Sequence, residues 1–142
     1  MKISVVTPSL NGLPYLRDAA RSVLSQEGSF GLEWVIIDGG STDGTAEFVE
    51  ELAAPRVRWS SEPDRGQAHA LNKALGLADG DVIGWLNTDD LYAPGALAAV
   101  AEAFERNPAA QWLAGHEVHG VDVRFDVVAV LGTELSVIEG AF

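Results

Sequence analysis

The chain has 142 residues, of which 47% are hydrophobic, and this length and composition suit one globular domain with its own core. The formal net charge of −12 argues against a nucleic-acid partner, because phosphate backbones are bound by basic patches, but it leaves room for a single phosphorylated ligand. The absence of cysteine excludes a disulfide framework, a thiolate zinc site and a catalytic cysteine. The sequence shows no membrane-spanning run and no signal peptide, so we expect a cytoplasmic chain.

The N-terminal part of the sequence predicts alternating strands and helices. Residues 3–9 are β-branched and apolar, as in a strand that is buried on both faces. A helix with one apolar stripe is expected from Pro14 onward, since proline suits the first turn of a helix. Residues 33–40 predict a second buried strand that ends in glycines, and Asp43 is a suitable cap for the helix that follows.

The pattern continues through the middle of the chain. Residues 56–62 predict a third strand, residues 66–78 a helix, and residues 81–87 a fourth buried strand. Pro94 opens a further helix, and residues 111–115 are a candidate for one more strand.

The last stretch has a different pattern. It alternates apolar and polar residues and turns at Gly132, which predicts a β-hairpin of residues 123–131 against 135–138.

This order of elements predicts an α/β fold in which a mostly parallel sheet is flanked by helices, with the hairpin at the C-terminus. In such sheets, ligands lie outside the carboxyl ends of the strands. Polar clusters at residues 7–11, 38–43 and 87–90 follow the first, second and fourth expected strands. We therefore expect these three segments to meet at one ligand-binding edge.

Asp89 and Asp90 form the first chemistry-bearing pair. Mg²⁺ and Mn²⁺ prefer carboxylate oxygens and often take one or two of them together with substrate phosphates. Asp90 is suited to hold such a metal, while Asp89 is suited to hydrogen-bond a sugar hydroxyl. On the residues alone, a cap for the helix after Pro94 or a solvated loop stays an alternative.

Two further stretches carry candidate ligand residues. Asp38, at a strand end, is a candidate for ligand binding, and the glycines after it match neither a P-loop nor a dinucleotide fingerprint. Asp64, Arg65 and Gly66 lie at an expected helix start, where a phosphate would be attracted, although Asp64 could simply cap that helix. His69 is expected to pack rather than to bind a metal.

Four stretches, in order, resemble the family 2 glycosyltransferases, which have the GT-A fold: SVVTPSLNGLPYLRDAARSVLSQ, EWVIIDGGSTDGT, EPDRGQAHALNKAL and GDVIGWLNTDDLYAPGAL. The resemblance covers about residues 2–115. It implies a nucleotide-binding, Rossmann-like half, a nucleotide-diphosphosugar donor, and a divalent metal, Mg or Mn. It also implies inverting transfer to a sugar or lipid-linked acceptor of cell-envelope polysaccharide, with peripheral contact at the inner membrane face as an alternative location.

The resemblance also assigns roles to individual residues. The donor-binding positions are Thr7, Pro8, Ser9 and Asn11 at the nucleotide pocket, Asp38 at the base-binding acid, Asp64, Gly66 and Asn72 beneath the donor, and Asp89 at the sugar-nucleotide. Asp90 falls at the metal position of the D-x-D-type motif. No residue is assigned as the catalytic base.

The sequence departs from the family pattern in three ways. Asn87 replaces the first acid of the D-x-D pattern, and Gly39 replaces the second acid after the second strand, so uridine need not be the base. The chain also lacks the usual acceptor-binding half with its general base. The alternative function is therefore a non-catalytic nucleotide-sugar-binding module, or a truncated enzyme whose acceptor side comes from a second copy or a partner chain.

The change of pattern near the C-terminus suggests that the chain divides into two parts. We expect a donor-binding domain at residues 1–115 and a hairpin tail at residues 116–142, with a separate origin of the tail as an alternative. Residues 112–142 resemble the C-terminal end of a small, restriction-endonuclease-like family of uncharacterised proteins. No nuclease activity is expected, because the sequence contains no E-x-K motif.

Overall fold

Strands and helices alternate along the part of the chain that the computed structural model describes, which is residues 1–52, 54–106, 113–114 and 126–128. The elements are β1 (Lys2–Ser9), α1 (Leu13–Leu24), β2 (Gly31–Asp38), α2 (Thr45–Glu51), β3 (Val57–Ser61), α3 (Gln67–Leu77), β4 (Val82–Trp85), α4 (Ala96–Arg106), β5 (Leu113–Ala114) and β6 (Asp126–Val128).

The strands form one sheet in the order β3-β2-β1-β4-β6-β5. The first four strands are parallel, and β6 runs antiparallel to both β4 and β5. The register sets Ser9, the last residue of β1, beside Asp38, the last residue of β2. The carboxyl ends of neighbouring parallel strands therefore lie side by side, as the sequence predicts.

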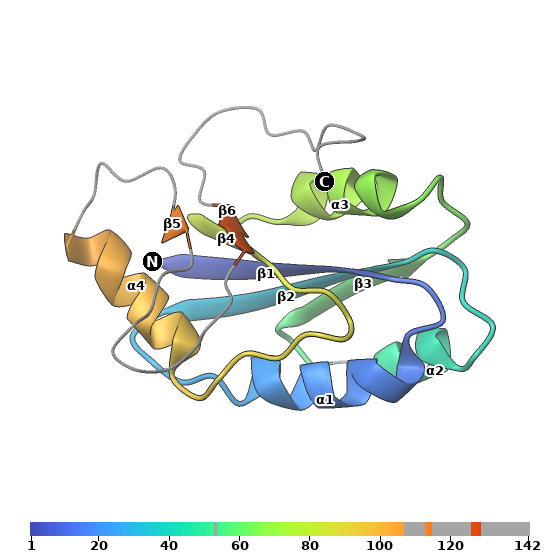
Figure 1. The fold of residues 1–142 in the computed structure, drawn as a ribbon, viewed down its shortest axis with the longest axis horizontal. Helices are drawn as coiled ribbons and strands as arrows, with labels where there is room; N and C mark the ends of the chain where they lie inside the picture. Colours follow the sequence, from blue (N-terminus) through green and yellow to red (C-terminus); the bar gives the residue numbers. More distant parts are fainter. Residues whose placement is uncertain (53, 107–112, 115–125, 129–142) are drawn as a thin grey trace.

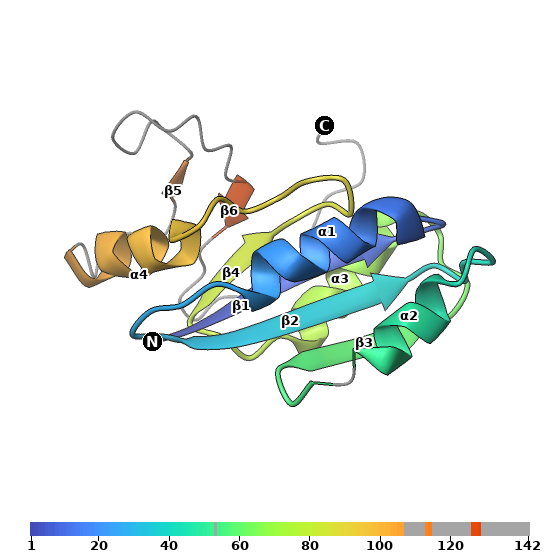
Figure 2. The ribbon, with the colours of Figure 1, turned by 90° about the horizontal axis from the view of Figure 1, so that it is seen from below.

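Helices cover both faces of the sheet (Figures 1 and 2). Helix α3 lies on one face, while α1, α2 and α4 lie on the other. Alternate residues of β1 supply the two cores: Ile3 and Val5 pack with residues of α1, and Val6 packs with residues of α3. Burial on both faces explains why β1 and β2 are nearly continuous apolar runs.

The α/β fold with a mostly parallel sheet is confirmed, with small differences at element ends. Strand β2 ends at Asp38 rather than in the glycines, since Gly40 has φ +87° and turns the chain. Strand β4 ends at Trp85, although the N–H of Leu86 still donates to the carbonyl of Val6. No helix in the described ranges is both long and apolar enough to cross a membrane.

The predicted hairpin is only partly testable. Residues 126–128 of its first strand form β6, which lies between β4 and β5, so neither edge of β6 is left for the predicted partner strand. Residues 135–138, predicted to be that partner, lie outside the described residues. The described piece of the tail thus extends the sheet beside β4. The strand predicted at residues 111–115 is represented by β5.

Candidate functional site

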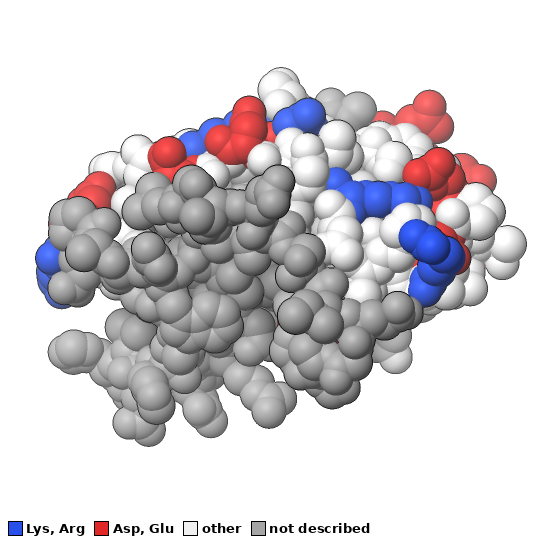
Figure 3. Space-filling model, turned by 90° about the horizontal axis from the view of Figure 1, so that it is seen from above, with Lys and Arg blue, Asp and Glu red and all other residues white. Residues whose placement is uncertain are grey.

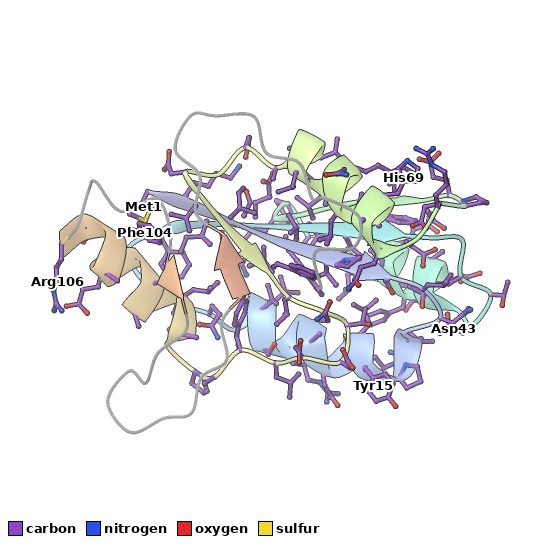
Figure 4. All side chains as sticks on the ribbon, turned by 45° about the horizontal axis from the view of Figure 1, so that its top comes forward. Met1, Tyr15, Asp43, His69, Phe104 and Arg106 are labelled. Carbon is purple, nitrogen blue, oxygen red and sulfur yellow. The ribbon has the colours of Figure 1, made fainter. Side chains whose placement is uncertain are left out.

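A cavity of about 440 Å³ opens at the carboxyl edge of the sheet. Its lining comes from the exit of β1, the start of α3 and the exit of β4, and consists of Pro8, Ser9, Leu10, Asp64, Gly66, Gln67, Ala70, Asn87, Thr88 and Asp89. In Figure 4, His69 of α3 and Asp43 lie at the end of the molecule opposite Met1 and Arg106. This is the ligand-binding edge that the strand order predicts.

The wall at the end of β1 carries a buried hydroxyl group. Ser9 is 5% exposed, and its Oγ has no hydrogen-bond partner within the described chain. Leaving a buried polar atom unpaired is costly, so such an atom calls for an explanation such as a missing ligand or water. Ser9 lines the cavity, while its hydroxyl oxygen is itself buried beside Gly12.

A second wall is formed by the turn into α3. The N–H of Gly66 donates to Asp64 Oδ1 at 2.7 Å, and Gly66 has φ +106°, a conformation that favours glycine. The turn brings the N-terminal end of an 11-residue helix to the cavity, where the helix dipole favours an anionic group. Asp64 lies against Gly39, since a Cβ at Gly39 would be 2.9 Å from Asp64 Oδ2.

The third wall is the turn after β4. The N–H of Asp90 donates to the carbonyl of Asn87 at 3.2 Å, which closes a turn over residues 87–90. The side-chain Oδ1 of Asn87 accepts hydrogen bonds from Gln67 Nε2 at 2.9 Å and Trp85 Nε1 at 3.0 Å. Its Nδ2 donates to Asp90 Oδ2 at 3.1 Å. Asp89 and Asp90 are both exposed, and Asp89 lines the cavity.

Asp38 organises the loop that follows β2. Its carboxylate is fully buried and accepts four hydrogen bonds: from the backbone N–H groups of Gly40 and Ser41, from the hydroxyl of Ser41, and from Ser61 Oγ at 2.6 Å. The loop is thereby tied to β3. In this arrangement the Asp38 carboxylate stabilises the loop beside the cavity and is not among the groups that line it.

The same loop is joined to the start of α1. Asn11, with φ +52°, accepts a hydrogen bond from the N–H of Thr42 and donates its own N–H to Ser41 Oγ. Asp43 accepts from the N–H of Leu13 at 2.9 Å and from Thr45. Burial alone would raise the pKa of Asp43, but these hydrogen bonds outweigh it and lower that pKa.

Asp43 was expected to cap α2. The N-cap residue is instead Gly44, whose φ of +93° suits glycine, while the Asp43 side chain still accepts the N–H of Thr45.

The structure separates the predicted donor-binding residues into groups. Pro8, Ser9, Asp64, Gly66 and Asp89 line the cavity. Asn11 and Asp38 belong to the adjoining loop network, and Asp90 lies on the β4 turn. Thr7 is fully buried, and its Oγ1 accepts a hydrogen bond from Trp34 Nε1 at 2.9 Å; Asn72 is exposed on α3, outside the cavity lining.

Five cavity residues had been assigned no donor-binding role: Leu10, Gln67, Ala70, Asn87 and Thr88. Three of them, Leu10, Asn87 and Thr88, lie within the segments that were expected at the ligand edge. Gln67 is the first residue of α3, and Ala70 lies one turn further along the same face. Helical spacing from the glycine at the turn could therefore have identified both. The positions of Leu10 and Thr88 depend on how the two strand exits approach each other, which spacing does not give.

The acids at the β4 turn fit a hard divalent cation. Within the described residues there is no group of three or more His, Cys, Asp or Glu side chains that could hold a metal ion. At this turn the described residues thus offer one or two carboxylates, a donor set that suits Mg²⁺ or Mn²⁺ completed by phosphate and water oxygens. Asp90 and Asp89 are the residues that could hold it.

Charge on the cavity side is mixed. Figure 3 shows the face that carries α3, where acidic and basic side chains are interspersed.

A parallel sheet with an open cavity at its carboxyl edge, a helix N-terminus on one side and carboxylates on the other, is the arrangement of α/β domains that bind phosphorylated ligands. The comparisons with known proteins define the class more closely. The family model described as Glycosyl transferase family 2 matches residues 4–133, and the chain belongs to this family. The match extends past residue 115, where we expected the donor-binding part to end.

Relatives and solved structures agree with this family. An uncharacterized glycosyltransferase of Nostoc sp. is 31% identical over 140 residues, which are 96% of this chain and 43% of that protein. The crystal structure of S. aureus TarS 1–349 in complex with UDP-GlcNAc has a TM-score of 0.69 and 26% identity, over 76% of this chain and 32% of that one.

A second solved structure, of the mannosyltransferase PcManGT from Pyrobaculum calidifontis in complex with GDP-Man and Mn²⁺, has a TM-score of 0.65 and 30% identity. It matches 72% of this chain and 32% of that chain. The likeness to both structures confirms the expected glycosyltransferase fold. The chain therefore spans less than half the length of the Nostoc relative and about a third of these two structures.

Proposed function

We propose that the chain is the donor-binding part of a glycosyltransferase that holds a nucleotide-diphosphosugar in the cavity, with Mg²⁺ or Mn²⁺ beside Asp90. The observation that carries the proposal is the cavity at the sheet edge, which the end of β1, the N-terminus of α3 and Asp89 line together. Two related structures support the ligand class, since one was solved with UDP-GlcNAc and the other with GDP-Man and Mn²⁺.

In this proposal each wall of the cavity has its own task. The exit of β1, with Pro8 and Ser9, binds the nucleoside, with Thr7, Asn11 and Asp38 supporting the loops around it. The start of α3, with Asp64 and Gly66, faces the diphosphate, because backbone N–H groups at a helix N-terminus favour anions. Asn72, which lies outside the cavity lining, is the donor residue that the structure supports least.

The turn after β4 completes the donor site. Asp89 accepts hydrogen bonds from sugar hydroxyls, and Asp90 binds the metal. When bound, the metal neutralises negative charge that develops on the diphosphate leaving group.

The proposed reaction is an inverting transfer. The bond between the anomeric carbon and the diphosphate oxygen breaks as an acceptor hydroxyl oxygen bonds to that carbon from the opposite face. The hydroxyl proton passes to a general base on the acceptor side. We propose a sugar or lipid-linked acceptor of cell-envelope polysaccharide, with the acceptor side supplied by a second copy or a partner chain, and a cytoplasmic location that includes peripheral contact with the inner membrane face.

A second candidate is a non-catalytic nucleotide-sugar-binding module. It requires only the donor cavity, which the described residues form. Under this candidate, residues 1–115 bind the donor, and residues 116–142 are a tail of separate origin, as the resemblance to a restriction-endonuclease-like family suggested. The two candidates differ in whether a bound donor is turned over.

Calorimetry of the full chain with UDP, GDP and dTDP, each with and without Mn²⁺, tests the proposal. We expect nucleotide binding that Mn²⁺ strengthens, and loss of that Mn²⁺ dependence in Asp90→Ala, because the variant removes one of the two carboxylates that the β4 turn offers the metal. Asp18→Ala, which removes an exposed carboxylate on α1, is the matched control. Unchanged Mn²⁺ dependence in Asp90→Ala would contradict the metal assignment, while slow hydrolysis of a bound donor would favour the enzyme over the module.

A further inference from the structure

We propose that Asn87 is a positioning residue: its side-chain amide fixes the carboxylate of Asp90 for the metal and is not itself a ligand. The inference rests on the proposed function and explains the departure of this sequence from the D-x-D pattern at its first position. It concerns the residue that stands where the family pattern has an acid.

The hydrogen bonds of Asn87 fix the orientation of its amide. Oδ1 receives two N–H donors, from Gln67 at 2.9 Å and Trp85 at 3.0 Å, and an indole nitrogen can only donate. Nδ2 faces Asp90 Oδ2 at 3.1 Å, and a carboxylate can only accept. A flipped amide would place like groups together at both ends, so the network permits one orientation.

This orientation leaves the Asn87 oxygen unsuited to a cation. Its lone pairs accept from two side-chain N–H groups, of Gln67 on α3 and Trp85 on β4. A metal ligand at this oxygen would have to displace one of those donors and would lie beside its positive hydrogen. The oxygen therefore holds the Asn87 side chain in place, and the amide nitrogen donates a hydrogen bond to Asp90.

Two contacts from Asn87 hold Asp90. The backbone carbonyl of Asn87 accepts the N–H of Asp90 at 3.2 Å, and the side-chain amide donates to Asp90 Oδ2. Asp90 is exposed, and a carboxylate on an exposed turn would otherwise sample several rotamers. Holding Oδ2 restricts that rotation and leaves Oδ1 to bind a cation, which lowers the ordering cost of metal binding.

An aspartate at position 87 could not perform this task. Its carboxylate could still accept from Gln67 and Trp85, but it has no proton to donate to Asp90. It would instead set a second anionic oxygen about 3 Å from Asp90 Oδ2, where two carboxylates repel each other. In this chain the asparagine thus fits its three partners, and an acid does not.

Titration of the full chain with Mn²⁺ alone tests the inference. Binding is followed by calorimetry and by paramagnetic broadening of the Trp85 indole N–H signal. We expect Asn87→Ala to weaken Mn²⁺ binding about fivefold, the effect of one lost hydrogen bond. Asn87→Asp should also bind Mn²⁺ no more tightly than the wild type. Thermal unfolding of each variant shows whether the fold is kept.

Control variants separate this inference from the proposed function. Asp90→Asn should lose the site, and Asp18→Asn, with the same change of charge on α1, should not. Loss in Asp90→Asn with wild-type affinity in Asn87→Ala would overturn the positioning role and leave the metal assignment intact. Tighter binding in Asn87→Asp would make position 87 a ligand position, which also overturns it. Absence of Mn²⁺ binding in the wild type, both alone and with UDP or GDP, would reject both.

Discussion

Gly39 directly follows β2, and the space in front of it is taken by Asp64. An ideal Cβ at Gly39 would lie 2.9 Å from Asp64 Oδ2, closer than real Cβ contacts, while the backbone at Gly39 is not in the left-handed region. The family pattern has a second acid at this position. In this chain, the Asp64 carboxylate from the β3–α3 loop occupies that space, so the two acids exclude each other.

We therefore predict that Gly39→Asp destabilises the fold by about 1 kcal/mol, because two carboxylates are forced together at the cavity wall. It should also weaken UDP binding in the presence of Mn²⁺, since Asp64 must turn away from the N–H of Gly66. Thermal unfolding and calorimetry measure the two effects. Adding Asp64→Ala should relieve most of the loss of stability, which a double-mutant cycle would detect as coupling.

Gly76→Asp is the matched control for this cycle. Gly76 lies on α3, and nothing lies within 4 Å of a Cβ placed there. The substitution adds the same charge without a clash, so its effect and that of Asp64→Ala should be additive. Additive effects for Gly39→Asp and Asp64→Ala would contradict the exclusion of one acid by the other.

At the scale of elements, Glu33 joins three strands at the end of the sheet opposite the cavity. Its buried carboxylate accepts hydrogen bonds from Ser4 of β1 at 2.6 Å, Arg58 of β3 at 3.0 Å and the N–H of Asp79 at 3.2 Å. Burial alone would raise the pKa of Glu33, but these hydrogen bonds and the charge of Lys2 lower it from 4.5 to about 2.

Because the pKa of Glu33 is lower in the folded than in the unfolded state, its contribution to the stability of the fold decreases as the pH falls. The stabilisation by Glu33 is present above its unfolded pKa and is lost as the pH falls from about 4.5 to about 2, to a total of about 3 kcal/mol. We predict that Glu33→Gln is less stable at pH 7 and that its stability falls less between pH 5 and pH 3. Urea unfolding at each pH measures this difference.

Glu47→Gln, on the exposed side of α2, is the control for this experiment, because other carboxylates also titrate in the same range. It should follow the wild type at every pH. Parallel stability curves for Glu33→Gln and the wild type would show that the carboxylate does not link the strands in the way the structure indicates.

The elements were predictable because their signals are local. The continuous apolar runs of β1 and β2 identify strands buried on both faces, and the helix expected between them then favours parallel pairing. Element ends were harder to predict, as at β2, where the two glycines do not reveal that the strand ends before them, at Asp38. Strand β6 could not be placed beside β4 by periodicity, since pairing between distant segments is decided by tertiary packing.

The sequence predicts that the site lies at the carboxyl edge of the sheet, but it does not identify every residue that lines the site. Thr7 shares a strand face with Ile3 and Val5, so alternation along β1 could have assigned it to the core beside Trp34. For Asp38 no such local signal exists. One of its partners, Ser61, lies 23 residues away on β3, and only the folded sheet brings the two together.

At the scale of the whole molecule, the net charge of −12 opposes the approach of an anionic nucleotide diphosphate. A divalent cation reverses part of this effect, because it is attracted by the same field and reduces the charge of the nucleotide that it accompanies. The proposed metal at Asp90 would therefore assist binding at long range as well as by direct contact. Salt screens the long-range part and leaves the short contacts largely unchanged.

We predict opposite salt dependences for the two ligands. Raising the ionic strength from ~10 mM to ~100 mM shortens the Debye length from ~30 Å to ~10 Å, so UDP without metal should bind more tightly and Mn²⁺ alone should bind more weakly. Calorimetry at the two ionic strengths measures both affinities. Uridine, which carries no phosphate, is the control, and its affinity should not change. If UDP binding weakened with salt as Mn²⁺ binding does, local cationic groups such as the α3 N-terminus and Arg65 would outweigh the field of the acidic chain.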